Sequence, residues 1–490
     1  MTTSKLWQLS ATALLAGYAR RAFSPVEVLD ELLGRIAQLD HRLHAYLAVN
    51  AADARRAARA AEAAWLAPGE RPLLCGVPVS VKDLIEMAGL PTTYGSLAFR
   101  ENHQADAEVV ARLRRAGAVL VGKTNTPEFG LLGGVRNRLG PDGRNPWSLE
   151  RSCGGSSGGA AAAVAAGLGP LAVGSDSGGS IRGPAAFNGV FGLKPSQGRV
   201  PEVQRWCPAP GRGQGGPLAR TVRDSALLLQ ALAGPDPRDP DALPGPVPNF
   251  LGSLHSPLRD VRVAVSADLG NVAGVDAEVG TMIDEAAALL RERGCVVSTA
   301  APPALATDDV LAPGVWAYAG DLYAALEMLE PDFLARHSDA LTDYAAAVCA
   351  AGQRALAWQY RGILRRNAAY AEAMRGWFEG YDFLVCPAAA GPAPRVEAVR
   401  PINRGGGRTP GFLPQFNVAQ TPAASIPFAF HSSGLPLAIQ VVGRHGDDAG
   451  VLQLAAAIEA ARPWADRWPP GAFGMDAEEH DRTGGPGATC

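Results

Sequence analysis

The chain lacks an excess of charge of either sign. Its 490 residues contain 45 Lys and Arg against 48 Asp and Glu, and no run of basic residues stands out. A surface that binds nucleic acid needs clustered cations to neutralise phosphates, and nothing in this sequence supplies them. We therefore expect no nucleic acid among the partners of this protein.

Histidine and cysteine are also scarce, with 8 and 7 residues scattered along the chain. No HExxH or CxxC spacing occurs, so the sequence predicts neither a metal site nor any other cofactor. An odd number of dispersed cysteines fits reduced thiols better than a disulfide framework, which favours a cytoplasmic protein. Cys153 is expected to serve packing alone.

Long hydrophobic runs are missing too. The most apolar window, residues 160–174, is mostly Ala and Gly and is broken by Pro170. The N-terminal segment 6–19 is interrupted by Gln8 and Ser10, which is unlike a signal peptide. Neither segment is apolar enough to span a bilayer, so we expect no membrane partner.

What is present suits a large globular core, because 47% of the residues are apolar and only 19% are charged. Large α/β enzymes can form one unit of this length, and we expect a single domain over residues 1–473. Residues 301–380 are expected to form a peripheral helical elaboration whose many aromatic residues are mostly core. The polar, glycine-rich tail 474–490 is expected to be disordered.

The order of the expected elements indicates the fold class. A capping box at Ser24–Glu27 begins a helix that runs to about residue 43. Further along, a pattern of helix, glycine and strand recurs three times. The strands that end these units are expected at residues 118–121, 171–173 and 295–298. Such alternation predicts an α/β fold with a mixed, mostly parallel twisted sheet that is covered by helices on both faces.

Two motifs suggest other functions, but their surroundings do not fit. Residues 117–124 match the P-loop pattern GxxxxGK[ST], yet the four spacer residues resemble a buried strand rather than a phosphate-binding turn. Residues 154–158 match GxSxG, the nucleophile elbow of α/β-hydrolases, but we expect no strand in segment 145–153 before it. His431 or His445 would be the base in that arrangement, and a lone histidine is more often structural.

Two serine–glycine clusters, residues 154–159 and 178–182, indicate a different chemistry. Glycines beside a serine leave backbone N–H groups accessible, as a serine nucleophile with an oxyanion hole requires. Without a suitable histidine, such a serine needs a neutral lysine as its base, which burial can produce. Lys82 and Lys123 each end an apolar strand, and periodicity alone does not separate these two candidates.

Several motifs in one order resemble the amidase signature family over nearly the whole chain. They are GVPVSVKD from residue 76, GKTNTPEF from 122, RNPW from 144, GGSSGG from 154, GSDSGGSIR from 174, GLKPSQGRV from 192 and FNVAQTPAASIP from 416. The resemblance implies the fold of that family, with a signature core at about residues 70–225. It also implies hydrolysis of a carboxylic amide C–N bond without a cofactor. We expect a stand-alone amidase for a small-molecule amide and allow for a homodimer; the alternative is the glutaminase subunit of a tRNA-dependent amidotransferase.

The resemblance further implies roles for individual residues. Lys82 matches the catalytic lysine, Ser156 the bridging serine, whose preceding peptide bond is cis in the family, and Ser180 the nucleophile. The amides expected to form the oxyanion hole are those of Ser177, Gly178, Gly179 and Ser180. The residues expected to support the site are Ser157, Asp176 and Arg182.

Other positions are expected to shape the surroundings of the site. Asn125 and Glu128 are expected to brace loops beside it. Segments 134–144 and 201–216 depart from the family pattern, so substrate specificity is least transferable there.

Overall fold

The computed structural model describes residues 5–202, 213–258, 260–305, 307–399 and 411–473, and for residues 307–317 it describes the backbone only. The expected tail, residues 474–490, lies outside the described residues, so its disorder stays a prediction. The extent of the single domain likewise stays a prediction.

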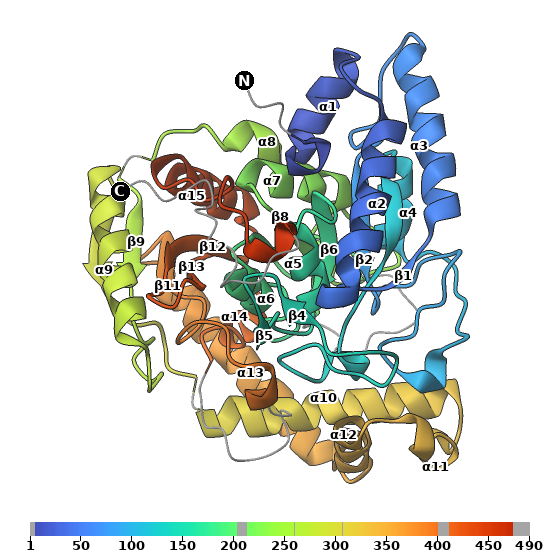
Figure 1. Ribbon diagram of the computed structural model, residues 1–490. Coiled ribbons are helices and arrows are strands. Elements are labelled where there is room, and N and C mark those ends of the chain that lie inside the picture. Colours follow the sequence, from blue (N-terminus) through green and yellow to red (C-terminus); the bar gives the residue numbers. More distant parts are fainter. Residues whose placement is uncertain (1–4, 203–212, 259, 306, 400–410, 474–490) are drawn as a thin grey trace.

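A twisted sheet of 11 strands runs through the molecule in the order β1-β3-β2-β6-β8-β7-β12-β13-β11-β9-β10 (Figure 1). Its strands are β1 (Tyr46–Val49), β2 (Pro78–Lys82), β3 (Val119–Thr124), β6 (Leu171–Ser175), β7 (Phe191–Lys194), β8 (Gly215–Ala219), β9 (Arg262–Val265), β10 (Val296–Thr299), β11 (Phe383–Pro387), β12 (Ala423–Phe430) and β13 (Pro436–Gly443).

The predicted α/β class with a mixed sheet is confirmed, but the expectation that most strand pairs are parallel is wrong. Within the part of the chain that the structure describes, only the pairs β2–β3, β2–β6, β9–β11 and β9–β10 are parallel. The other six pairs are antiparallel. The helix-linked units recognised in the sequence lie toward the two ends of the sheet, where a crossover helix permits parallel pairing. The middle is filled by strands such as β12 and β13, whose short connection imposes an antiparallel hairpin.

Helices cover both faces of this sheet. They are α1 (Ala11–Ala19), α2 (Pro25–Leu43), α3 (Ala51–Leu66), α4 (Glu108–Arg115), α5 (Gly158–Ala165), α6 (Arg182–Asn188), α7 (Val222–Leu232), α8 (Phe250–Ser253), α9 (Ala277–Glu292), α10 (Thr307–Leu329), α11 (Phe333–Arg336), α12 (Asp343–Gln353), α13 (Ala357–Trp377), α14 (Gln415–Val418) and α15 (Asp448–Ala461). The largest apolar cluster joins the sheet to α4, α7, α9 and α15, whereas α5 and α6 pack on β6 and β8 from the opposite face.

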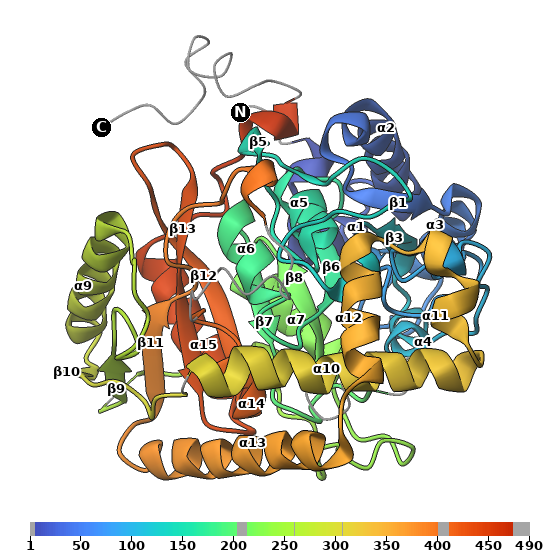
Figure 2. The same cartoon turned by 90° about the horizontal axis from the view of Figure 1, so that it is seen from below.

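Helices α10 to α13 form a separate layer along one edge of the molecule (Figures 1 and 2). Phe333 and Tyr344 of this layer are buried as predicted. Trp358 is not, since 72% of it is exposed at the start of α13. Within the described residues, the structure contains no helix with the length and apolar character that crossing a membrane requires.

Segment 145–153 departs from its prediction. A two-stranded ribbon, β4 (Arg144–Asn145) and β5 (Ser148–Ser152), forms there outside the main sheet. The polar sequence of β5 gives no apolar alternation because its residues are only partly covered. Cys153 follows directly and is fully buried in an apolar cluster, which fits its expected packing role.

The sheet also determines where the candidate residues meet. Strands β2 and β6 are parallel neighbours, so their carboxyl ends, at Lys82 and Ser175, lie at the same edge. Helix α5 begins just after Ser156 and α6 just after Ser180. Three short stretches that are distant in sequence, around Lys82, around Ser156 and at residues 175–180, are thereby brought to one edge of the sheet.

Candidate active site

Lys82 lies at the end of β2 and is fully buried. Side chains alternate along a strand, so Val79 and Val81 enter the large core while Lys82 points to the other face. Its Nζ donates to Ser156 Oγ at 2.6 Å and also contacts the Ser175 hydroxyl at 3.0 Å and the Ser175 carbonyl at 3.3 Å. Burial lowers the pKa of Lys82 to about 7, although the Asp176 carboxylate opposes the shift. A large fraction of the amine is therefore neutral near neutral pH.

Lys123, the second candidate base, is held differently. Its Nζ lies 2.8 Å from the Asp83 carboxylate and donates to the Ile85 carbonyl and the Thr92 hydroxyl. Burial lowers the pKa of Lys123, and the Asp83 carboxylate counteracts that shift. Lys123 thus forms a buried ion pair beneath the site and contacts neither candidate serine. The two lysines are equal candidates for the base by sequence periodicity, but their contacts favour Lys82.

Ser156 and Ser157 connect the lysine to the rest of the site. Ser156 is almost fully buried, and the peptide bond from Gly155 to Ser156 is cis. Ser157 Oγ donates to the Ser175 carbonyl at 3.2 Å and accepts the Ser175 amide at 3.3 Å. The Ser157 amide donates to the Ser180 carbonyl at 3.1 Å. Ser157 therefore ties the strand end to the segment of Ser180, as expected of a supporting residue.

Asp176 and Arg182 support the loop that carries Ser180. Both are fully buried, and the guanidinium lies 2.9 Å from the carboxylate. Burial alone would raise the pKa of Asp176, but Arg182 holds it well below its usual range. The same carboxylate accepts the amides of Gly179, Ile181 and Arg182. Because Arg182 is engaged in this interior network, it is scaffold rather than a ligand for substrate.

The geometry changes one expectation about the oxyanion hole. The Gly179 amide donates to Asp176 Oδ1 at 2.7 Å. Because this N–H already has an acceptor within the protein, Gly179 is no longer a candidate donor to the oxyanion. The amides of Ser177, Gly178 and Ser180 donate to no group among the described residues. Ser180 is half-buried and Gly178 exposed, so this segment is accessible from solvent.

Sequence reasoning missed Ser175. Its hydroxyl and carbonyl both accept from Lys82, and its backbone is fixed by Ser157. The available signal was its position at the end of β6, a strand expected to run parallel to the lysine strand. Ser175 therefore belongs to the surroundings that hold the Lys82 amine.

Asn125 and Glu128 brace neighbouring loops, as predicted. Asn125 Nδ2 donates to the His44 carbonyl at 2.9 Å, and its oxygen accepts from Asn137 at 2.8 Å. The Glu128 carboxylate accepts the Thr342 amide at 2.7 Å, which links the loop to the start of α12.

The two histidines considered as bases lie elsewhere. His445 Nδ1 contacts the Gln420 carbonyl at 2.8 Å. His431 Nδ1 accepts the Ser433 amide at 3.0 Å, and its Nε2 lies 3.6 Å from the Asp276 carboxylate and 3.3 Å from the Glu278 carboxylate. These contacts connect the β12–β13 hairpin to the beginning of α9.

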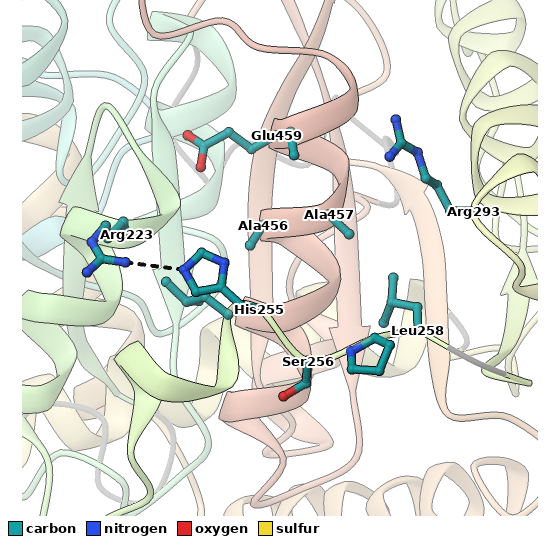
Figure 3. A pocket seen from close by; sticks show the side chains of 11 residues that line it. Arg223, His255, Ser256, Leu258, Arg293, Ala456, Ala457 and Glu459 are labelled. Atoms are coloured by element: carbon teal, nitrogen blue, oxygen red, sulfur yellow. Dashed lines mark hydrogen bonds between the residues drawn. The ribbon is translucent and has the colours of Figure 1, made fainter.

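A cavity of about 470 Å³ lies between α7, α15 and segment 254–258 (Figure 3). Arg223 and His255 lie side by side along its lining, 3.4 Å apart, and Ala456 and Ala457 of α15 line one wall. None of its lining residues belongs to the candidate catalytic set. This cavity is therefore separate from the edge of the sheet where Lys82 and the serines meet.

Comparisons with known proteins agree with the motifs. The family model described as Amidase matches residues 27–452. An acylamidase of Rhodococcus erythropolis is 34% identical, over 96% of this chain and 98% of that protein. A glutamyl-tRNA(Gln) amidotransferase subunit of Roseiflexus castenholzii is 36% identical, over 95% of this chain and 98% of that protein.

Solved structures of the same kind share the fold. A bacterial aryl acylamidase of the amidase signature enzymes superposes with a TM-score of 0.85 at 29% identity, over 93% of this chain and 97% of that one. A 6-aminohexanoate cyclic dimer hydrolase complexed with substrate gives a TM-score of 0.83 at 29% identity, over 96% and 100%. Because the family model covers most of the chain and the fold agrees, the protein belongs to the amidase signature family and is an amidohydrolase.

Proposed function

We propose that the protein hydrolyses small amides through an acyl-enzyme on Ser180, with Ser156 and Lys82 as a proton relay. The observation that carries the proposal is the 2.6 Å contact between Lys82 Nζ and Ser156 Oγ at a fully buried position. A lysine can act as a general base only when it is neutral, and burial lowers its pKa to about 7. No other described lysine contacts either serine.

In the first half-reaction, Ser180 Oγ attacks the amide carbonyl and passes its proton to Ser156, which passes its own to Lys82. The developing oxyanion is stabilised by the amides of Ser177, Gly178 and Ser180. The relay then returns a proton to the departing nitrogen, the C–N bond breaks, and an acyl-serine and an amine or ammonia result.

In the second half-reaction, the same relay takes a proton from water, whose oxygen attacks the acyl-serine. Collapse of the second tetrahedral intermediate returns the proton to Ser180 and releases the carboxylic acid. The balance is one amide and one water consumed, and one acid and one amine formed. No cofactor enters any step.

The substrate we favour is a small acyl amide that the isolated chain turns over by itself. Support comes from the acylamidase relative and from the aryl acylamidase structure. The alignment with this chain covers nearly the whole length of each of these two proteins. The second candidate function is a glutaminase subunit, favoured by the amidotransferase relative at 36% identity. A subunit of that kind would act on glutamine and would require partner chains.

The test is to measure release of 4-nitroaniline from 4-nitroacetanilide, and of ammonia from simple alkyl amides and from glutamine, with the isolated chain. Ser180→Ala is the matched negative control because it removes one oxygen from a half-buried residue. Turnover of the anilide or alkyl amide that is lost in Ser180→Ala supports the stand-alone amidase. Turnover of glutamine alone supports the subunit. If Ser180→Ala retains more than about a tenth of the activity on any amide, the nucleophile assignment is refuted.

A further inference from the structure

A tight turn at residues 128–130 packs directly against the bridging serine. Phe129 has φ 52° and ψ 18°, a left-handed backbone conformation that residues other than glycine rarely adopt. Gly130 follows with φ 73°. A Cβ at Gly130 would lie 3.2 Å from Ser156 Oγ and 3.0 Å from a methyl of Leu84. The backbone of this turn is therefore one wall of the space around the Ser156 hydroxyl.

Such a backbone conformation persists only where neighbouring groups hold it. The Phe129 amide donates to the Tyr94 carbonyl at 2.8 Å, and the Phe129 ring is fully buried. The Tyr318 hydroxyl, from α10, donates to the Phe129 carbonyl at 2.7 Å. The carbonyl at the strained residue is thus held by a side chain that is 189 residues away in sequence.

A second hydroxyl from the same helical layer holds the preceding residue. Tyr344 Oη, on α12, accepts the Glu128 amide at 2.8 Å and donates to the Arg136 carbonyl at 2.7 Å. One apolar cluster contains Phe129 and Leu131 of the turn together with residues of α10, α11 and α12. The peripheral layer seen in Figure 2 is consequently built into the wall of the candidate site.

We propose that Tyr318 is a positioning residue for amide hydrolysis: its hydroxyl, through the Phe129 carbonyl, holds the left-handed turn in place against Ser156. The turn leaves just enough space for the Ser156 hydroxyl to lie against the Lys82 amine. Released from Tyr318, Phe129 relaxes toward an ordinary conformation and its peptide moves toward Ser156. This inference rests on the relay of the proposed function and assigns the α10 layer a part in it.

The test is Tyr318→Phe, which keeps the ring and removes only the hydroxyl. We expect kcat on the amide that the isolated chain turns over to fall about fivefold, the rate equivalent of one hydrogen bond, with KM unchanged. The matched control is Tyr323→Phe, on the same helix, because the Tyr323 hydroxyl has no hydrogen-bond partner among the described residues. Tyr318→Phe should lower the free energy of unfolding by only about 1 kcal/mol, the usual contribution of one hydrogen bond, and Tyr323→Phe should leave it unchanged.

A double-mutant cycle shows whether the effect passes through Ser156. The rate at which a fluorophosphonate labels Ser180 is measured with Tyr318→Phe in the wild-type and Ser156→Ala backgrounds. We expect Tyr318→Phe to slow labelling in the first background and to have no further effect in the second. Equal slowing in both backgrounds, a rise in KM instead of a fall in kcat, or wild-type kcat would overturn the proposal. The proposed function fails separately, when Ser180→Ala or Lys82→Ala remains active.

Discussion

Replacing Lys82 by methionine should stabilise the protein while it removes the proposed catalytic base. Lowering the pKa of Lys82 from 10.5 to about 7 corresponds to a folding penalty of about 5 kcal/mol at or below pH 7. Methionine has a similar length and no charge to desolvate. It also leaves the Ser156 and Ser175 hydroxyls without the amine as partner, which costs about 1–3 kcal/mol for each group left unsatisfied. Taking about 2 kcal/mol for each hydroxyl, the expected net gain in the free energy of unfolding is about 1 kcal/mol at pH 7.

The gain should depend on pH in a definite direction. Between pH 7 and about 10, the unfolded chain binds a proton on Lys82 that the folded protein does not bind. Stability rises with pH wherever the unfolded state holds more protons, so the wild type gains up to about 1.4 kcal/mol per pH unit in this window. Lys82→Met lacks this titration. Its advantage is therefore largest at or below pH 7 and shrinks as the pH approaches 10.

The measurement is chemical denaturation of both proteins at pH 6, 7, 8 and 9, with the free energy of unfolding taken from the linear extrapolation. Lys123→Met is the matched control because it removes an equally buried lysine that is paired with Asp83 at 2.8 Å. Leaving that carboxylate buried without its cation should destabilise the protein by about 3–5 kcal/mol. The reasoning is refuted if Lys82→Met is less stable than the wild type at pH 6, or if the difference does not change with pH.

Three further outcomes are expected. The kcat/KM for amide hydrolysis should rise with pH through about 7 and then level off, because the neutral form of Lys82 is the active one; a flat profile from pH 5 to 9 would contradict this assignment. Ser180→Ala should lower kcat by about 10⁴-fold or more and abolish fluorophosphonate labelling, as intact-protein mass spectrometry would show. Asp176→Asn should lower the free energy of unfolding by about 3–5 kcal/mol, measured with urea, because Arg182 stays buried without its counter-ion; an unchanged midpoint would argue against the scaffold role.

The limits of the sequence are clearest at the two lysines. Lys82 and Asp83 are adjacent in the chain, yet their side chains point to opposite sides, and Asp83 pairs with Lys123 of the neighbouring strand. A contact across parallel strands leaves no local pattern, so spacing could not separate the two bases. The family motif could, because it places one lysine in a fixed order with the serines. Lys82 and Ser156 of that order do meet, whereas their further contacts had to come from the structure.

The same limit explains the errors in the sheet. Strand β8 is Gly-Gly-Pro-Leu-Ala and is largely buried, so it has neither the β-branched residues nor the alternation that mark an exposed strand. The helix-linked strands at the ends of the sheet were recognised because glycine follows each helix. The hydrogen bond from the Gly179 amide to the Asp176 carboxylate joins backbone to side chain, and no sequence pattern indicates it. The sequence therefore could not show that Gly179 is unavailable to the oxyanion.

Helix α5 limits how this enzyme could be engineered. All eight of its residues are buried, and none is larger than valine. A Cβ on Gly159 would lie 2.5–2.6 Å from backbone atoms of Ala45 and Asn125, so the helix touches its neighbours main chain to main chain. A bulkier side chain in α5 would push the helix away from its neighbours and displace Ser156, which lies just before it. Most substitutions in α5 would therefore inactivate the protein in a mutant library aimed at new substrates. Diversity is better placed at the exposed positions 138, 140 and 141, because Val135 of the same segment packs against this helix.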